Sequence, residues 1–182
     1  MRRIQTNELI LCALFVAATV VLSQISIPIG PVPINLAHIA TFLAAGLLGA
    51  RSAALSQAVF VLMGAVGLPV FSGFRGGLER VFGPTGGYII AYIGCAYLAG
   101  YIIQRFGKSP KVLAAAIYAG WAVAYLFGTA WYSYITHTPM GAALMICVVP
   151  FLIGDALKTV LIVYLIRVLN PIVHRQGKTA GA

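Results

Sequence analysis

Long apolar stretches occupy most of this chain, and a protein in water could not cover them all. Residues that could form a polar surface are scarce: 8% of the chain is charged, whereas soluble domains carry about 25% charged residues. The acidic residues are Glu8, Glu79 and Asp155 alone. The composition therefore predicts an all-α integral membrane protein, in which residues 1–182 form one membrane domain.

Six apolar stretches are candidates for transmembrane helices. A helix needs about 20 residues to cross roughly 30 Å of hydrocarbon. The second and third stretches are short, so one of them is expected to be little tilted, broken or partly re-entrant. The sixth is long and has to tilt or project into water, and Pro150 predicts a kink within it. The expected helices cover residues 8–27, 35–50, 52–69, 86–104, 110–134 and 141–169.

Basic residues are divided unevenly between the two sides that six crossings define. The side with both termini carries nine of them, whereas the other side carries Arg75 and Arg80. Cytoplasmic loops are enriched in Lys and Arg, so both termini are predicted to be cytoplasmic in a prokaryotic cell membrane. This topology explains the net charge of +9 without a nucleic-acid partner. The nine residues are Arg2, Arg3, Arg51, Arg105, Lys108, Lys111, Arg167, Arg175 and Lys178.

A glycine-rich segment over residues 67–87 separates the third and fourth stretches. Its backbone polar groups cannot stay unpaired in lipid, so it has to line a cavity or lie at a membrane surface. The charge distribution places it outside the cell, where it is expected to hold a polar ligand. Glycines on both sides of Arg75 let the backbone fold closely around such a ligand. A solvated Arg75 that binds lipid phosphate, and a surface pair between Glu79 and Arg80, are the open alternatives.

Asp155 and Lys158 are the charged residues that topology does not explain, because both lie inside the sixth stretch. At positions i and i+3 they share one helix face. A charge near the bilayer centre costs roughly 2.5–3.5 kcal/mol, so such residues normally face a cavity or one another. The pair therefore indicates a substrate site, in which Asp155 accepts hydrogen bonds from ligand N–H groups. A purely structural ion pair is the alternative.

Other candidate features are weaker. Trp121 and Tyr125, at i and i+4, are the best candidates for packing on an apolar ligand ring, while most other aromatic residues are expected at the membrane interface. The cysteines have no metal-binding spacing and are expected to be small buried residues. The histidines form no metal motif, and Gly107-Lys108-Ser109 lacks the preceding glycine of an ATP-binding loop. These negative results concern Cys12, Cys95, Cys147, His38, His137 and His174.

Several short motifs, taken together and in order, resemble the BioY family, the biotin-binding S components of energy-coupling-factor transporters. The resemblance covers about residues 8–170 and is most specific at Gly83-Pro84-Thr85-Gly86-Gly87-Tyr88. It implies a six-helix subunit that captures biotin from outside, without a cofactor, and associates with a transmembrane coupling subunit and two ATPases. The other motifs are Pro31-Val32-Pro33-Ile34, Gly67-Leu68-Pro69-Val70-Phe71, Gly76-Gly77 and Gly154-Asp155 followed by Lys158.

The resemblance also implies a binding site for biotin. It places Asp155 and Lys158 in this site together with the loop before the Gly83–Tyr88 motif. Biotin carries a ureido ring with two N–H donors and one carbonyl, an apolar ring and a carboxylate. A pocket for it needs an acceptor, a few donors and an aromatic wall within an apolar cleft. The candidate substrate-binding residues are Asp155, Lys158, Arg75, Thr85, Tyr88, Trp121 and Tyr125.

The first helix carries small residues four positions apart, at Ala13 and Ala17. In lipid, such residues allow the backbone of another helix to approach closely. The resemblance to S components implies that this face contacts the coupling subunit, and packing within the subunit is the alternative. A facilitator or secondary transporter that works without ATPase partners is the competing function, although the two halves of the chain show no convincing repeat. An enzyme is not expected, because no Ser/His or paired-Asp arrangement is present.

Overall fold

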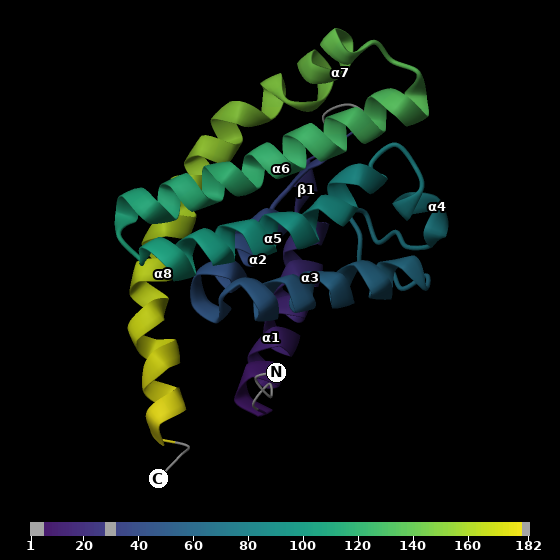
Figure 1. The fold of residues 1–182 in the computed structure, drawn as a ribbon. Helices are drawn as coiled ribbons and strands as arrows, with labels where there is room; N and C mark the ends of the chain where they lie inside the picture. The colour runs from purple at the N-terminus through teal and green to yellow at the C-terminus, as the bar shows by residue number, and fades with distance from the viewer. Residues whose placement is uncertain (1–5, 28–31, 180–182) are drawn as a thin grey trace.

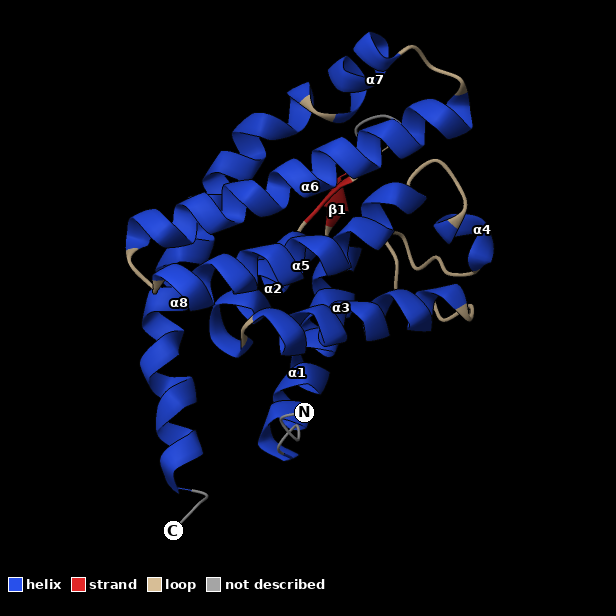
Figure 2. Ribbon diagram, viewed as in Figure 1, coloured by secondary structure: helices blue, strands red, loops and turns tan. Residues whose placement is uncertain are grey.

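The computed structural model describes residues 6–27 and 32–179, with side chains through residue 171. The fold is a bundle of helices with one short antiparallel ribbon (Figures 1 and 2). The ribbon pairs β1 (Ser26–Ile27) with β2 (Ile34–Asn35). The helices are α1 (Thr6–Gln24), α2 (Ala37–Leu48), α3 (Ala50–Ala65), α4 (Leu78–Val81), α5 (Gly86–Phe106), α6 (Pro110–Thr136), α7 (Met140–Cys147), the 3-10 turn η1 (Val149–Phe151) and α8 (Leu152–Thr179).

Four helical segments in the described part of the chain are long and apolar enough to cross a membrane. They are Thr6–Gln24, Gly86–Phe106, Pro110–Thr136 and Met140–Pro171. The other two apolar helices, α2 and α3, have 12 and 16 residues, which gives lengths of about 18 and 24 Å. A single residue, Gly49, joins them with a φ of 84°, a backbone conformation that favours glycine.

The sixth predicted stretch, 141–169, is not one kinked helix. The structure ends α7 at Cys147, inserts η1 around Pro150 and starts α8 at Leu152. Proline has no N–H for the helical ladder, and here its effect is a complete break. α8 also continues past the predicted end, through Pro171 to Thr179. The break brings Cys147 and Phe151 beside the same cavity as the first turns of α8.

Three segments lie close together at one end of the bundle: the junction between α2 and α3, the loop between α5 and α6, and the second half of α8. Gln104 Oε1 accepts a hydrogen bond from the Ala50 N–H at 3.3 Å, and Lys108 Nζ donates to Asn170 Oδ1 at 2.5 Å. Five of the predicted cytoplasmic basic residues belong to these segments: Arg51, Arg105, Lys108, Lys111 and Arg167. Arg2, Arg3 and Pro31, and the side chains of His174, Arg175 and Lys178, lie outside the described residues.

Helices α5 and α6 pack side by side in the centre of the bundle (Figure 1). Small residues allow this close packing, as is usual between helices in lipid. The Gly120 carbonyl accepts a hydrogen bond from Cys95 Sγ at 3.0 Å, and a Cβ atom at Gly128 would lie 2.5 Å from the Tyr88 ring. The largest fully buried apolar side chains of the bundle are Phe42, Phe60, Leu113, Ile117, Ile162 and Ile166.

A buried polar cluster fixes the rotation of α1 against its neighbours. Gln57 Nε2 of α3 donates to Thr19 Oγ1 of α1 at 3.2 Å, and Gln57 Oε1 accepts from Thr41 Oγ1 of α2 at 3.2 Å. Such interhelical hydrogen bonds contribute to packing where lipid supplies no polar partners. This rotation leaves Ala13 and Ala17 exposed on the outer side of α1, which argues against packing within the subunit as their role.

A substitution at Gly100 tests the close approach of α5 and α3. A Cβ atom at residue 100 would lie 2.6 Å from the backbone N and Cα of Ala50. We expect Gly100→Ala to lower the free energy of unfolding by about 1–3 kcal/mol, because overpacking pushes the helices apart. Thermal unfolding in detergent measures this loss. Gly141→Ala, where a Cβ would meet nothing within 4 Å, is the control; equal losses in both variants would contradict the prediction.

Candidate ligand-binding site

A cavity of about 490 Å³ lies between the glycine-rich loop and helices α2, α5, α6 and α8. Its volume falls in the range of sites for small molecules, about 300–1,000 Å³. Its walls come from segments that are far apart in the sequence, from Ser23 at the end of α1 to Lys158 on α8. All seven candidate residues predicted from the sequence line it: Arg75, Thr85, Tyr88, Trp121, Tyr125, Asp155 and Lys158.

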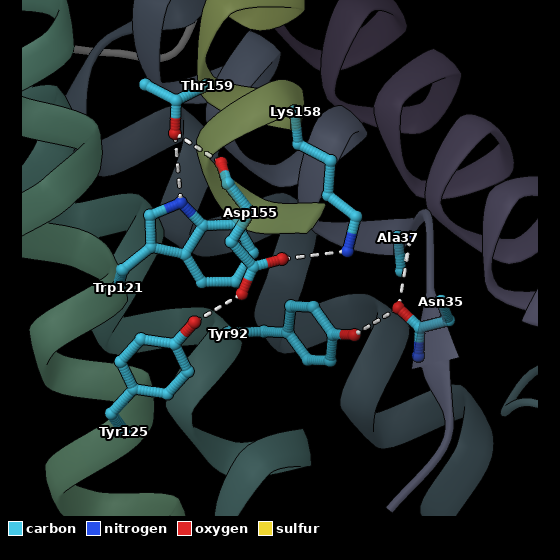
Figure 3. A network of polar contacts seen from close by, with 8 residues as sticks. All are labelled: Asn35, Ala37, Tyr92, Trp121, Tyr125, Asp155, Lys158 and Thr159. Atoms are coloured by element: carbon cyan, nitrogen blue, oxygen red, sulfur yellow. Dashed lines mark hydrogen bonds and ion pairs between the residues drawn. The ribbon is translucent and has the colours of Figure 1, made fainter. Parts of the chain in front are cut away.

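The inner end of the cavity holds the Asp155–Lys158 ion pair. Lys158 Nζ lies 2.9 Å from Asp155 Oδ1, and the Tyr125 hydroxyl donates to Asp155 Oδ2 (Figure 3). Asp155 is 4% exposed and Lys158 is 9% exposed. Each charge is thus desolvated, and the geometry compensates it with a direct partner. A carboxylate accepts about four hydrogen bonds, so Asp155 has capacity left for a ligand.

An aromatic wall stands next to this ion pair on α6. The rings of Trp121 and Tyr125 are stacked with their centroids 6.0 Å apart. Trp121 Nε1 donates to Thr159 Oγ1 at 3.3 Å, and Thr159 Oγ1 in turn donates to the Asp155 carbonyl at 2.7 Å. Lys158 Nζ lies 5.6 Å from the Trp121 ring centroid, within the range of a cation–π interaction. The wall and the ion pair are therefore held as one unit (Figure 3).

The glycine-rich loop covers the other end of the cavity and is fastened to α1. Ser23 Oγ donates to the Val70 carbonyl at 2.5 Å, and Gln24 Oε1 accepts from the Phe74 N–H at 2.9 Å. Phe74 has a φ of 56°, in the left-handed region that non-glycine residues rarely adopt. The backbones of Phe71 and Arg75 pair across the resulting turn. The loop is thus an ordered cover over the cavity.

Two arginines of the glycine-rich segment lie at the mouth of the cavity. Arg75 is exposed and Arg80 is half-buried, and both line the cavity. Neither forms an ion pair within the described part of the chain, so the alternative of a Glu79–Arg80 surface pair is not seen there. Thr85, also at the mouth, is half-buried. The mouth therefore presents positive charge to an arriving ligand.

Tyr88 lines the cavity, but its hydroxyl is committed to neighbouring helices. It lies 2.7 Å from Thr129 Oγ1 of α6 and donates to the Cys147 carbonyl at 3.4 Å. Its ring packs against the space that Gly128 leaves open. A ligand is therefore expected to contact the ring of Tyr88 and not its hydroxyl.

Sequence reasoning missed three residues of the cavity wall: Asn35, His38 and Tyr92. Asn35 Oδ1 accepts from the Tyr92 hydroxyl at 3.2 Å and from the Ala37 N–H at 3.1 Å. Its Nδ2 donates to Ser72 Oγ of the cover at 3.0 Å. The signal that could have found this group is an asparagine and a histidine three residues apart in an otherwise apolar stretch.

Apolar helices around a cavity with a buried ion pair, an aromatic wall and a positively charged mouth define a membrane protein that binds a small polar molecule. Comparison with known proteins gives the family. The chain belongs to the BioY family, whose sequence profile matches residues 1–175.

Individual relatives agree with this assignment. The chain is 39% identical to the probable biotin transporter BioY of Pyrococcus horikoshii over 154 residues, which cover 85% of this chain and 90% of that protein. It is 37% identical to the biotin transporter BioY of Thermotoga maritima over the same shares. Its fold is similar to the crystal structure of the S-component for biotin from an ECF-type ABC transporter, with a TM-score of 0.85 and 29% identity over 90% of both chains. These similarities confirm the predicted family and the all-helical membrane fold.

Proposed function

We propose that this protein is the biotin-binding S component of an ECF-type ABC transporter. It is a binding subunit and not an enzyme, and ATP hydrolysis by partner subunits drives uptake. The observation that carries the proposal is the cavity of a BioY family member, with an inner ion pair, an aromatic wall and two arginines at the mouth. These three parts match the three parts of biotin.

The inner end suits the ureido ring of biotin. Asp155 accepts a hydrogen bond from a ureido N–H, and Lys158, which has three N–H donors, donates to the ureido carbonyl. The apolar ring of biotin packs against Trp121 and Tyr125, whose rings are stacked along the same side of the cavity. Because hydrogen bonds to charged groups are stronger than neutral ones, the ion pair is expected to contribute to selection of the ligand's head.

The mouth suits the carboxylate of biotin. Arg75 and Arg80 line it without an ion-pair partner in the described part of the chain. A guanidinium can bind a carboxylate through two parallel hydrogen bonds, and the Thr85 hydroxyl is an additional donor. With the head at the inner end, the alkyl tail extends toward the cover and its carboxylate reaches these arginines. Biotin therefore enters from the side of the glycine-rich loop.

This arrangement fits a six-span topology in which α2 and α3 also cross the membrane. The basic residues of the α2–α3 junction and the α5–α6 loop, and Arg167 in the second half of α8, then lie in the cytoplasm with both termini, in agreement with the bias toward cytoplasmic Lys and Arg. The cover and its two arginines lie outside. The transmembrane coupling subunit contacts the exposed face of α1 that carries Ala13 and Ala17.

Binding of biotin by the isolated subunit tests the proposal. Calorimetry on the detergent-purified protein is expected to show tight, one-to-one binding of biotin and much weaker binding of thiamine or riboflavin. The reason is that neither competitor combines a neutral ureido head with a carboxylate tail. Correctly folded protein that does not bind biotin would overturn the proposed function.

A further inference from the structure

A second, smaller hollow lies where the loop between α5 and α6 meets the second half of α8 (Figure 1). Its volume is about 200 Å³, which is below the range of about 300–1,000 Å³ for sites that enclose a small molecule. The hollow therefore suits one group of a larger ligand whose remainder lies outside it. Its walls are formed by Lys108, Leu113, Ile166, Arg167 and Asn170.

Two cations line this second hollow without an anion beside them. Lys108 belongs to the loop and Arg167 to α8, and both residues are exposed. Neither forms an ion pair within the described part of the chain, and none of the chain's three acidic side chains lines the hollow. Partial burial of the ammonium group lowers the pKa of Lys108, as expected for a cation that is desolvated without a compensating charge. An anionic ligand would supply the missing partner.

The donors in the second hollow suit a phosphate group. Lys108 Nζ donates to Asn170 Oδ1 at 2.5 Å, which holds the lysine toward α8. An ammonium group has three N–H donors, so two remain for a ligand. Arg167 lies three residues before Asn170 on the same face of α8, and its guanidinium presents N–H donors in a fork that matches phosphate oxygens. The two cations can therefore bind one phosphate group from two sides.

The surroundings of the second hollow point to a lipid as the source of this phosphate. Its walls include the fully buried Leu113 and Ile166. Tyr164, one turn before Arg167 on α8, is 64% exposed, and Phe106 at the end of α5 is 68% exposed. Exposed aromatic side chains close to basic residues are typical of a membrane interface. Basic pockets between membrane helices on the cytoplasmic side bind the head groups of anionic lipids, and the proposed topology places this end of the bundle on that side.

We propose that the second hollow binds the phosphate group of an anionic phospholipid, through Lys108 and Arg167, with Asn170 positioning the lysine. The acyl chains then lie along the exposed apolar side chains of α5 and α8. This lipid site is separate from the biotin site, because none of its residues lines the larger cavity. The inference uses the proposed topology only to assign the lipid to the cytoplasmic leaflet.

Native mass spectrometry of the detergent-purified protein tests the proposal. The protein is mixed with equal amounts of phosphatidylglycerol and of a diacylglycerol with the same acyl chains, which lacks the phosphate. The parent is expected to retain one phosphatidylglycerol in preference to diacylglycerol. In Lys108→Gln/Arg167→Gln the ratio of the two retained lipids is expected to fall roughly 25-fold, since each cation near an anionic lipid contributes roughly fivefold. The ratio is measured within one sample, so a difference in the fraction of folded protein cancels.

The control, Arg51→Gln/Lys111→Gln, removes two cations from the same end of the bundle that do not line the second hollow. It is expected to change the ratio little. Equal losses in the two double variants, or a parent that retains both lipids equally, would overturn the inference. Displacement of the lipid by inorganic phosphate would also overturn it, in favour of a soluble phosphate. Biotin binding by Lys108→Gln/Arg167→Gln is expected to match that of the parent, so the proposed function is tested separately.

Discussion

Replacing Asp155 by alanine is expected to lower biotin affinity by roughly tenfold to over a hundredfold, the effect of losing a hydrogen bond to a charged group. The substitution removes the acceptor for a ureido N–H and leaves the Lys158 ammonium buried without its partner at 2.9 Å. Lys158→Ala is expected to lower biotin affinity by a comparable factor, because it leaves the buried Asp155 carboxylate without its ion-pair partner. Calorimetry with biotin measures both effects. Asp155→Asn keeps the shape of the side chain but makes it a weaker acceptor of the hydrogen bond from the ureido N–H.

A double variant separates ligand recognition from stability. Breaking a buried ion pair on one side costs about 3–5 kcal/mol, whereas replacing both partners with apolar residues is often neutral. Asp155→Leu combined with Lys158→Met is therefore expected to unfold at about the temperature of the parent and still not bind biotin. If either alanine variant binds biotin as the parent does, the pair is a structural ion pair and not part of the binding site.

Ala17→Trp, and likewise Ala13→Trp, is expected to abolish assembly with the coupling subunit and ATP-driven uptake. Both alanines are exposed on α1, and close approach of two helices in lipid needs small residues at the contact. An indole at this position separates the helices, and overpacking of about 1–3 kcal/mol corresponds to an association weaker by roughly tenfold to a hundredfold. Co-purification with the partner subunits and uptake of labelled biotin into vesicles measure the two effects.

The control places the same indole on another exposed helix face. Leu126 of α6 is 75% exposed, so Leu126→Trp adds similar bulk away from α1 and is expected to assemble normally. Biotin binding by the isolated Ala17→Trp subunit is expected to survive, because Ala17 does not line the cavity. Normal uptake by the Ala17→Trp variant would contradict the proposed interface. Loss of binding together with assembly would show that the substitution disturbs the fold.

Charge was the most informative guide to the site, for a physical reason. An ionised residue in an apolar helix normally faces a cavity or another charge, so the positions of Asp155 and Lys158 predicted a substrate site, with a structural ion pair as the alternative. Glycine around Arg75 was informative for a similar reason, since irregular backbone cannot lie exposed to lipid and has to line a cavity or lie at a membrane surface. In the structure these residues, together with the predicted aromatic ones, line one cavity.

Residues whose surroundings come from distant segments could not be found in this way. Nothing in the sequence around His38 distinguishes it from other residues of an apolar helix. Its surroundings in the cavity wall are the rings of Tyr92 and Trp121, which belong to α5 and α6. Asn35 was expected to begin a helix, but pairing with Ser26 places it in β2 instead. Pro150 predicted a kink, whereas the full break also depends on the turn that the Phe151 N–H closes onto the Val148 carbonyl at 2.9 Å.

The pairing of Asp155 with Lys158 also affects which charge a ligand's head group can carry. Together the two side chains are neutral, so a neutral head group can enter the inner end without leaving either ion uncompensated. A cationic head would compete with Lys158 for Asp155, and an anionic head would compete with Asp155 for Lys158. Either would leave a buried ion without its partner, which is strongly unfavourable. We therefore expect the inner end to reject ligands whose head group is charged, through electrostatics that are already in place before any ligand arrives.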